Sequence, residues 1–113
     1  MNIKKYEEIA LSTLTGNHSY GDVSSKLMAQ ILGLVGESGE VAEKFKKILR
    51  DKNGELSEND KNEIAKELGD ILWYVTSVSH LIGFSLEDIA KKNNEKLLSR
   101  KDRNQIKGVG DNR

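Results

Sequence analysis

Two long stretches of helical periodicity, joined by one short turn, constrain this sequence more than any other feature. Apolar residues recur every three or four positions over residues 25–50 and again over residues 57–82, and the chain contains no proline to interrupt them. Between them, residues 51–54 (DKNG) have the composition of a turn. Because so short a connection leaves two helices antiparallel, we expect a helical hairpin at the centre of the fold.

A shorter amphipathic segment flanks the hairpin on each side. Residues 2–15 share one apolar face, and Gly16 begins the loop that follows. Ser57 and Ser85 are capping residues for the third and fourth helices, the last of which we expect to end near Lys101. The sequence therefore predicts an all-α fold in the form of a four-helix bundle.

One domain accounts for the length. At 113 residues the chain buries only a modest core, so we expect association between copies to complete the bundle. We assign residues 1–101 to the helical domain and residues 102–113 to a flexible C-terminal tail. The composition, 36% hydrophobic and 32% charged, is that of a globular protein and argues against disorder.

Charge and cysteine content exclude several classes of partner and chemistry. Lysine plus arginine equals aspartate plus glutamate at 18 each, so no net charge draws the chain to nucleic acid or to an anionic membrane. There is no cysteine, which excludes disulfides, thiolate zinc sites and a cysteine nucleophile. The N-terminal stretch lacks the apolar run of a signal peptide, and no stretch approaches the ~20 apolar residues of a membrane span. We expect a cytoplasmic protein.

Four carboxylates break the apolar pattern of the two long helices. Glu37 lies at the border of its apolar stripe, with Glu40 roughly 60° further out on the same side. Glu67 falls within the stripe of the next helix, and Asp70 lies at its edge. Burying unpartnered carboxylates costs several kcal/mol, and like charges that converge repel one another. A divalent cation resolves both conflicts by supplying positive charge.

The spacing of these acids supports a metal site. Both pairs are acid-x-x-acid, which places each pair on adjacent turns of one helix face. Ligands that are all oxygen suit Mg²⁺, or alternatively Mn²⁺, rather than zinc, and Mg²⁺ readily takes phosphate oxygens as further ligands. One such pair in a highly charged chain is usually a solvated surface, but two on facing helices favour a site. A di-iron bundle needs Glu-x-x-His, and neither His18 nor His80 follows a carboxylate at that spacing.

Glycines inside the two long predicted helices are a further departure from ordinary helix composition. Each costs about 1 kcal/mol relative to alanine in a helix interior. We expect close helix packing to explain Gly36, whereas Gly39 and Gly69, inside the two acidic pairs, would leave room for substrate beside the metal.

These segments together resemble the MazG-like nucleoside triphosphate pyrophosphohydrolases, within the all-α NTP pyrophosphatase superfamily. The resemblance spans roughly residues 25–101. It is carried by the stretch from Gly33 to Lys47, by Lys66 to Tyr74, and by the Asn, Lys and Arg of the segment from Asn93 to Arg100.

The resemblance implies a Mg²⁺-dependent enzyme that cleaves an NTP or dNTP to the monophosphate and pyrophosphate. It implies Glu37, Glu40, Glu67 and Asp70 as metal ligands, and we assign the general base to Glu37 or Glu40. Substrate contacts are implied for Lys47, Tyr74, Asn93, Lys96 and Arg100. Members of the family are homodimers or homotetramers whose partner subunits help to shape the pocket.

Other interpretations remain open at this point. The substrate could be phosphoribosyl-ATP, dUTP or dCTP, because the length and the acidic pairs fit those relatives as well. A non-catalytic dimerisation module, with the acids in surface ion pairs, is disfavoured because Glu67 and Asn93 fall on apolar faces. Trp73 points away from the acidic face and is interpreted as a packing or subunit contact. The terminal GVGDNR either folds over substrate phosphates or is a frayed end.

Overall fold

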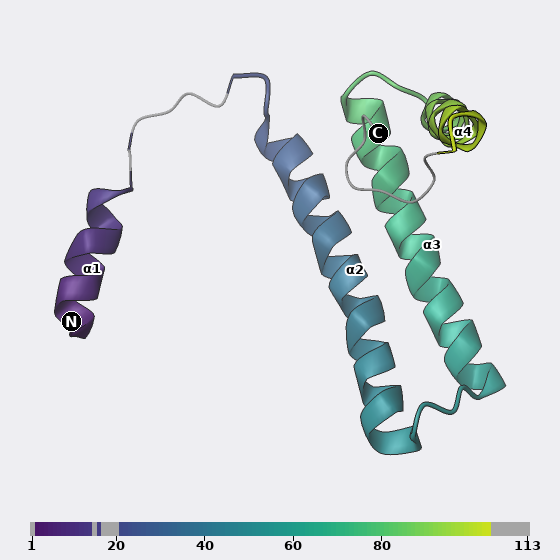
Figure 1. The fold of residues 1–113 in the computed structure, drawn as a ribbon, viewed down its shortest axis with the longest axis horizontal. Coiled ribbons are helices and arrows are strands. Elements are labelled where there is room, and N and C mark those ends of the chain that lie inside the picture. Colours follow the sequence, from purple (N-terminus) through teal and green to yellow (C-terminus); the bar gives the residue numbers. More distant parts are fainter. Residues whose placement is uncertain (1, 15, 17–20, 105–113) are drawn as a thin grey trace.

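The fold is all-α, as predicted. The computed structural model describes residues 2–14, 16 and 21–104, and these contain helices only: α1 (Ile3–Ser12), α2 (Ser25–Lys52), α3 (Glu58–Leu81) and α4 (Leu86–Asp102) (Figure 1). His18 and most of the predicted tail, residues 105–113, lie outside the described residues. The boundary between a domain at 1–101 and a tail therefore stays a prediction.

The third and fourth helices begin where the serines predict. The Ser57 hydroxyl accepts a hydrogen bond from the Asp60 N–H, and the Asp60 carboxylate accepts one from the Ser57 N–H, both at 3.0 Å. Ser85 and Asp88 repeat this reciprocal arrangement at the start of α4. Each pair satisfies two backbone donors that a helix start leaves without partners.

The second helix runs two residues past its predicted end at Arg50. It stops after Lys52 because Asn53 adopts a left-handed conformation with φ of 52°, and Gly54 follows with φ of 80°. Asparagine and glycine tolerate this conformation better than other residues, which makes them effective helix terminators.

Helices α2 and α3 form the predicted antiparallel hairpin. At the bend, the Lys52 ammonium lies 2.9 Å from an Asp60 carboxylate oxygen. Near the other end, the Ser77 hydroxyl donates a 2.9 Å hydrogen bond to the Gln30 side-chain oxygen. These two polar contacts fix the register of the long helix–helix contact between them.

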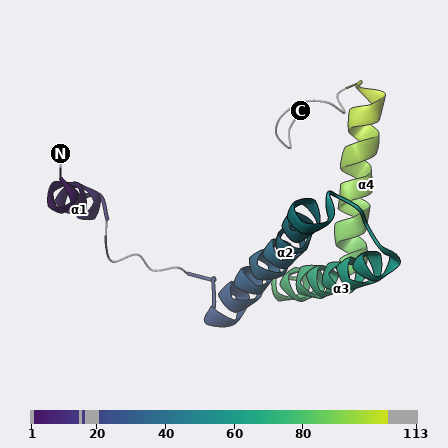
Figure 2. The ribbon, with the colours of Figure 1, turned by 90° about the horizontal axis from the view of Figure 1, so that it is seen from below.

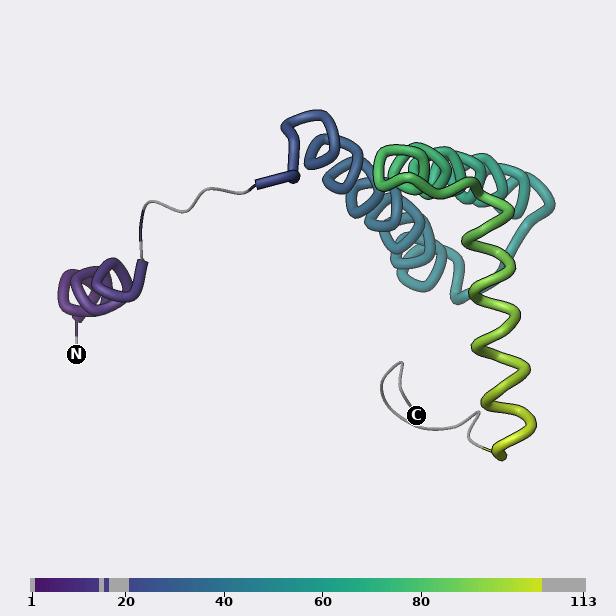
Figure 3. The backbone as a smooth tube through the Cα atoms, turned by 90° about the horizontal axis from the view of Figure 1, so that it is seen from above, coloured from purple at the N-terminus to yellow at the C-terminus, as the bar shows by residue number. Residues whose placement is uncertain are grey.

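The remaining helices make few contacts with the hairpin. Figures 2 and 3 show α4 standing away from the hairpin, and among the described residues it contacts α3 but not α2. Helix α1 contacts none of the other three. Ile48 and Ile64 are the only buried apolar residues in the described part of the chain, whereas many large apolar side chains are exposed. A single chain therefore lacks an extended core.

No helix between residues 21 and 104, nor α1, has the length and hydrophobicity that a membrane span requires.

Candidate metal centre

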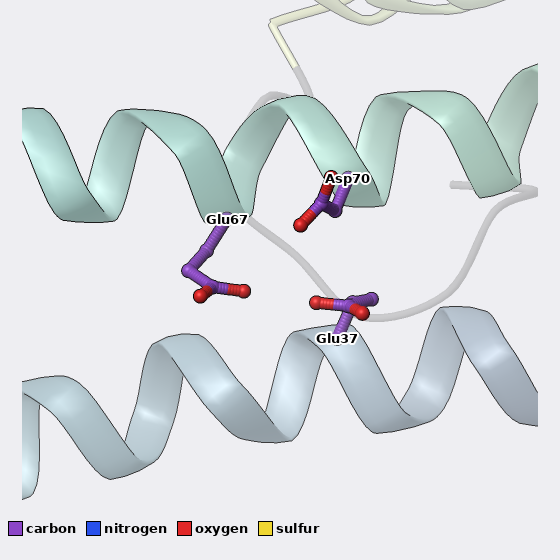
Figure 4. Close-up of side chains that lie close together, drawn as sticks. All are labelled: Glu37, Glu67 and Asp70. Carbon is purple, nitrogen blue, oxygen red and sulfur yellow. The ribbon is translucent and has the colours of Figure 1, made fainter.

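Three of the four predicted carboxylates meet between the two long helices. Glu37 on α2 and Glu67 and Asp70 on α3 each offer a carboxylate oxygen, and these oxygens lie within 4.8 Å of one another (Figure 4). Glu37 and Glu67 are half-buried, and Asp70 is exposed. Three hard oxygen donors converging from two rigid helices fit Mg²⁺ or Mn²⁺, so the donor set present suits the metal that the sequence implies.

The electrostatics of the cluster reflect crowding of negative charge. The pKa of Glu37 is raised above 4.5, first because its carboxyl hydrogen-bonds to Glu67 and second because it is partly desolvated. The charges of Asp70, Glu67 and Glu40 raise this pKa further. The raised pKa means that Glu37 keeps a proton more readily than an isolated carboxyl does, and a divalent cation would compete with that proton.

Glu40 does not join the three converging carboxylates. It lies one turn beyond Glu37, is exposed, and falls outside the group whose oxygens approach within 4.8 Å. Its charge still raises the pKa of Glu37. Around the axis of α2, Glu40 lies further than Glu37 from the side of the helix that faces α3, and this explains why its carboxylate does not join the cluster.

Lys44 is the neighbour of the cluster that sequence reasoning missed. Its ammonium lies 3.9 Å from a Glu67 carboxylate oxygen, and both side chains are partly shielded, at 33% and 21% exposed. The available signal was spacing: Lys44 follows Glu40 by four residues, an arrangement in which acid and base occupy the same helix face. The positively charged ammonium of Lys44 therefore lies beside the acidic cluster.

A shallow groove lies on the hairpin near the bend, and Lys44, which contacts Glu67, is one of its lining residues. Its volume is about 190 Å³, and Lys44, Lys47 and Lys52 are among its lining residues. Asp60 and Asp51 line it too, and the ammonium of Lys52 is engaged by Asp60. Lys47, a predicted phosphate contact, is exposed within reach of this groove.

Tyr74 is held by packing across the hairpin. Its ring lies against Gly33 of α2, where a Cβ would collide with the ring carbons. The ring of Trp73 meets it edge-on, with centroids 5.0 Å apart and planes at 89°. Gly36, by contrast, has nothing within 4 Å of its would-be Cβ, so the expectation that close packing explains Gly36 is wrong and Gly33 is the glycine at the contact.

The predicted substrate contacts on α4 lie apart from the carboxylates in a single chain. Asn93 and Lys96 line a hollow on α4 together with Leu86, Ile89, Ala90 and Lys92. Arg100 is buried at 5% exposed. Because α4 contacts α3 and not α2 among the described residues, the structure does not bring these side chains to the acidic cluster.

Comparison with known proteins agrees with the helical hairpin and its acids. A family model of the MazG nucleotide pyrophosphohydrolase domain matches residues 25–104, which include α2, α3 and α4. Over 82 residues the chain is 48% identical to the "Gene 37 protein" of Mycobacterium phage L5, covering 73% of this chain and 72% of that protein. No solved structure matches. The chain belongs to the MazG nucleotide pyrophosphohydrolase family.

Proposed function

We propose that this protein is a Mg²⁺-dependent nucleoside triphosphate pyrophosphohydrolase, which converts an NTP or dNTP and water to the monophosphate and pyrophosphate. The supporting observation is the convergence of Glu37, Glu67 and Asp70 within a domain of this family. A divalent cation bound there would neutralise phosphate charge and acidify the water that attacks phosphorus.

The chain's own side chains would supply the remaining functions. Glu37 or Glu40 would accept the proton from the attacking water, a role that fits the raised pKa of Glu37. Glu40, on the next turn, would complete the metal ligands once a cation and substrate are present. Lys47, in the groove toward the bend, would stabilise charge on the departing pyrophosphate.

The predicted contacts of α4 with substrate require a second copy. Asn93, Lys96 and Arg100 lie on a helix that stands away from its own hairpin, so a neighbouring subunit's cluster is the one they would reach. This proposal agrees with the expected homodimer or homotetramer. Tyr74 would face the nucleoside only at its exposed edge, since Gly33 covers part of its ring. A cytoplasmic setting, where nucleoside triphosphates are abundant, remains a prediction.

Pyrophosphate release from a panel of canonical and modified nucleoside triphosphates, with and without Mg²⁺, tests the proposed reaction. The panel includes dUTP, dCTP and phosphoribosyl-ATP, so the preferred substrate also separates the alternatives. We expect release that requires the metal. A folded, assembled protein that hydrolyses none of these compounds would favour the non-catalytic module instead.

The variant Glu67→Gln tests the site itself. The amide keeps the shape of the side chain but removes the negative charge, so turnover should fall by at least about 100-fold while helicity is unchanged. Glu58→Gln is the matched control, because Glu58 lies on the same helix, does not line the groove that holds Lys47, and forms its ion pair with Lys61. Equal turnover in the two variants would exclude Glu67 as a metal ligand.

A further inference from the structure

The α2–α3 hairpin carries different chemistry on the two sides of its acidic cluster. Away from the bend, residues 27–36 of α2 and 71–79 of α3 include no charged side chain, and we call them the uncharged half. Toward the bend, residues 43–52 and 58–66 are rich in lysine and in acids. The carboxylates lie between these two parts (Figure 4). A ligand with one anionic end and one uncharged end therefore meets matching surroundings in only one direction along the hairpin.

One face of α2 presents three different polar groups at intervals of seven residues: Gln30, Glu37 and Lys44. Seven residues are two turns, which advance about 10 Å along the axis and return to within about 20° of the same face. All three side chains contact α3. The Lys44 ammonium lies 3.9 Å from a Glu67 carboxylate oxygen, and the Gln30 side-chain oxygen accepts a 2.9 Å hydrogen bond from Ser77. The amide and the ammonium thus lie on opposite sides of the cluster.

Helix α3 repeats this interval. Ser77 follows Asp70 by seven residues, so the Gln30–Ser77 contact lies two turns, about 10 Å, from the place where Glu37 meets Asp70. This separation is comparable with the length of a nucleoside 5′-phosphate from its phosphorus to the far edge of its base. The ring of Tyr74 lies between the two contacts along α3.

The uncharged half has the groups that bind a nucleic-acid base. Tyr74 is half-buried, and Trp73, which meets its ring edge-on, is 60% exposed. Aromatic rings such as these are surfaces on which bases stack. Gln30 is half-buried, and its hydrogen bond to Ser77 uses the amide oxygen, which leaves the amide NH₂ without a partner among the described residues. An amide that offers both a donor and an acceptor can distinguish one base edge from another.

We propose that Gln30 is a specificity-determining residue whose amide contacts the base of the nucleotide substrate. The triphosphate then extends from the acidic cluster toward Lys44 and the bend, and the nucleoside extends past Tyr74 to Gln30. This inference rests on the proposed function. It adds the direction in which the nucleotide lies along the hairpin and a residue that selects its base.

Steady-state kinetics over the panel of nucleoside triphosphates test the role of Gln30 with a matched pair of variants. Gln30→Leu removes the amide, whereas Ser77→Ala breaks the same hydrogen bond between the helices and keeps the amide. We expect Gln30→Leu to reduce the ratio of kcat/KM between the best and worst bases by about 10-fold or more. Ser77→Ala should keep the wild-type ratios. A wild type that treats all bases alike, unchanged ratios in Gln30→Leu, or the same loss in both variants overturns the proposal.

Fluorescence of the unaltered protein tests the direction of the nucleotide without relying on catalysis. Trp73 is the only tryptophan of the chain, so its emission reports on the uncharged half. The probes are inorganic tripolyphosphate and a nucleoside triphosphate with a methylene group between its α- and β-phosphates, each with Mg²⁺ at a concentration that saturates binding by calorimetry. We expect the nucleotide analogue to change the emission of Trp73 and tripolyphosphate to leave it unchanged.

The two probes separate this inference from the catalytic proposal. An analogue that binds without affecting Trp73, or an equal effect of tripolyphosphate, overturns the assigned direction even if the protein hydrolyses nucleotides. An analogue that binds and changes the emission supports the direction even if no nucleotide is cleaved. Absence of both binding and cleavage overturns both proposals.

Discussion

The ring of Tyr74 occupies the space that a side chain at position 33 would need, so Gly33 and Tyr74 form a matched pair across the hairpin. Along the two helices, this contact lies between the acidic cluster and the Ser77–Gln30 hydrogen bond. The glycine is therefore needed for packing, although it weakens the helix itself.

We predict that Gly33→Ala destabilises the protein. Displacing the Tyr74 ring should cost about 1–3 kcal/mol, which exceeds the ~1 kcal/mol that alanine contributes to helix propensity. Urea unfolding followed by circular dichroism measures the change. Gly36→Ala is the control: nothing lies within 4 Å of its Cβ, so it should stabilise the helix by up to about 1 kcal/mol. The same sign for both variants would contradict the contact.

Removing the Lys44 cation should strengthen binding of Mg²⁺ to the nucleotide-free protein. The ammonium beside Glu67 competes with a metal for the same negative charge, whereas the methionine of Lys44→Met retains only the apolar stem. Since partly exposed ion pairs contribute about 0–1 kcal/mol, the expected gain in affinity is up to about five-fold by titration calorimetry. Lys46→Met, whose partner is Glu43, should bind Mg²⁺ as the wild type does. Equal affinities in all three proteins would remove Lys44 from the site.

The stability of the metal-free protein should depend on the protonation of Glu37. Its raised pKa means that, above the ordinary value of 4.5, the folded chain keeps a proton that the unfolded chain has released. The contribution of this group to stability therefore falls as the pH rises through that window. Unfolding in a chelator between about pH 4 and 7 measures the slope, which Glu37→Gln should flatten. Mg²⁺ should reverse the trend, because the metal binds the deprotonated carboxylates.

Asp60 should contribute more to stability than Asp88, although both complete the same kind of helix cap. Asp60 also binds Lys52 across the bend, and this contact with the two Ser57 hydrogen bonds lowers its pKa from 3.8 to about 2. Its stabilising effect is full above pH 3.8 and is lost as the pH falls toward 2. Comparing acid unfolding of Asp60→Asn with that of Asp88→Asn checks this expectation. A larger effect at Asp88 would show that the Lys52 contact adds nothing.

Local features of this fold are predictable from sequence, whereas long-range placements are not. Ser57 and Ser85 mark helix starts because the capping bonds join residues three apart. The meeting of Glu37 with Glu67 follows only in part, because the turn predicts an antiparallel hairpin but not its register. The separation of Asn93 from the cluster depends on the direction of α4 relative to the hairpin. That direction is set by the turn at Gly83, which has a φ of 92°, and the apolar periodicity of the sequence does not predict it. The spacing of Lys44 four residues after Glu40 places it on the acidic side of α2, but its contact with Glu67 was missed because Glu67 lies on another helix.

The ion pair at the bend also constrains how this chain can change length during evolution. Asp60 both completes the cap that Ser57 begins on α3 and pairs with Lys52, so it anchors the start of one helix to the end of the other. The carboxylates are then aligned by counting residues along rigid helices from that anchor. One residue inserted between Asp60 and Glu67 would rotate the second acidic pair by about 100° and carry it away from Glu37, with every side chain still present. Insertions between Asn53 and Leu56 would leave the count, and with it the alignment, unchanged.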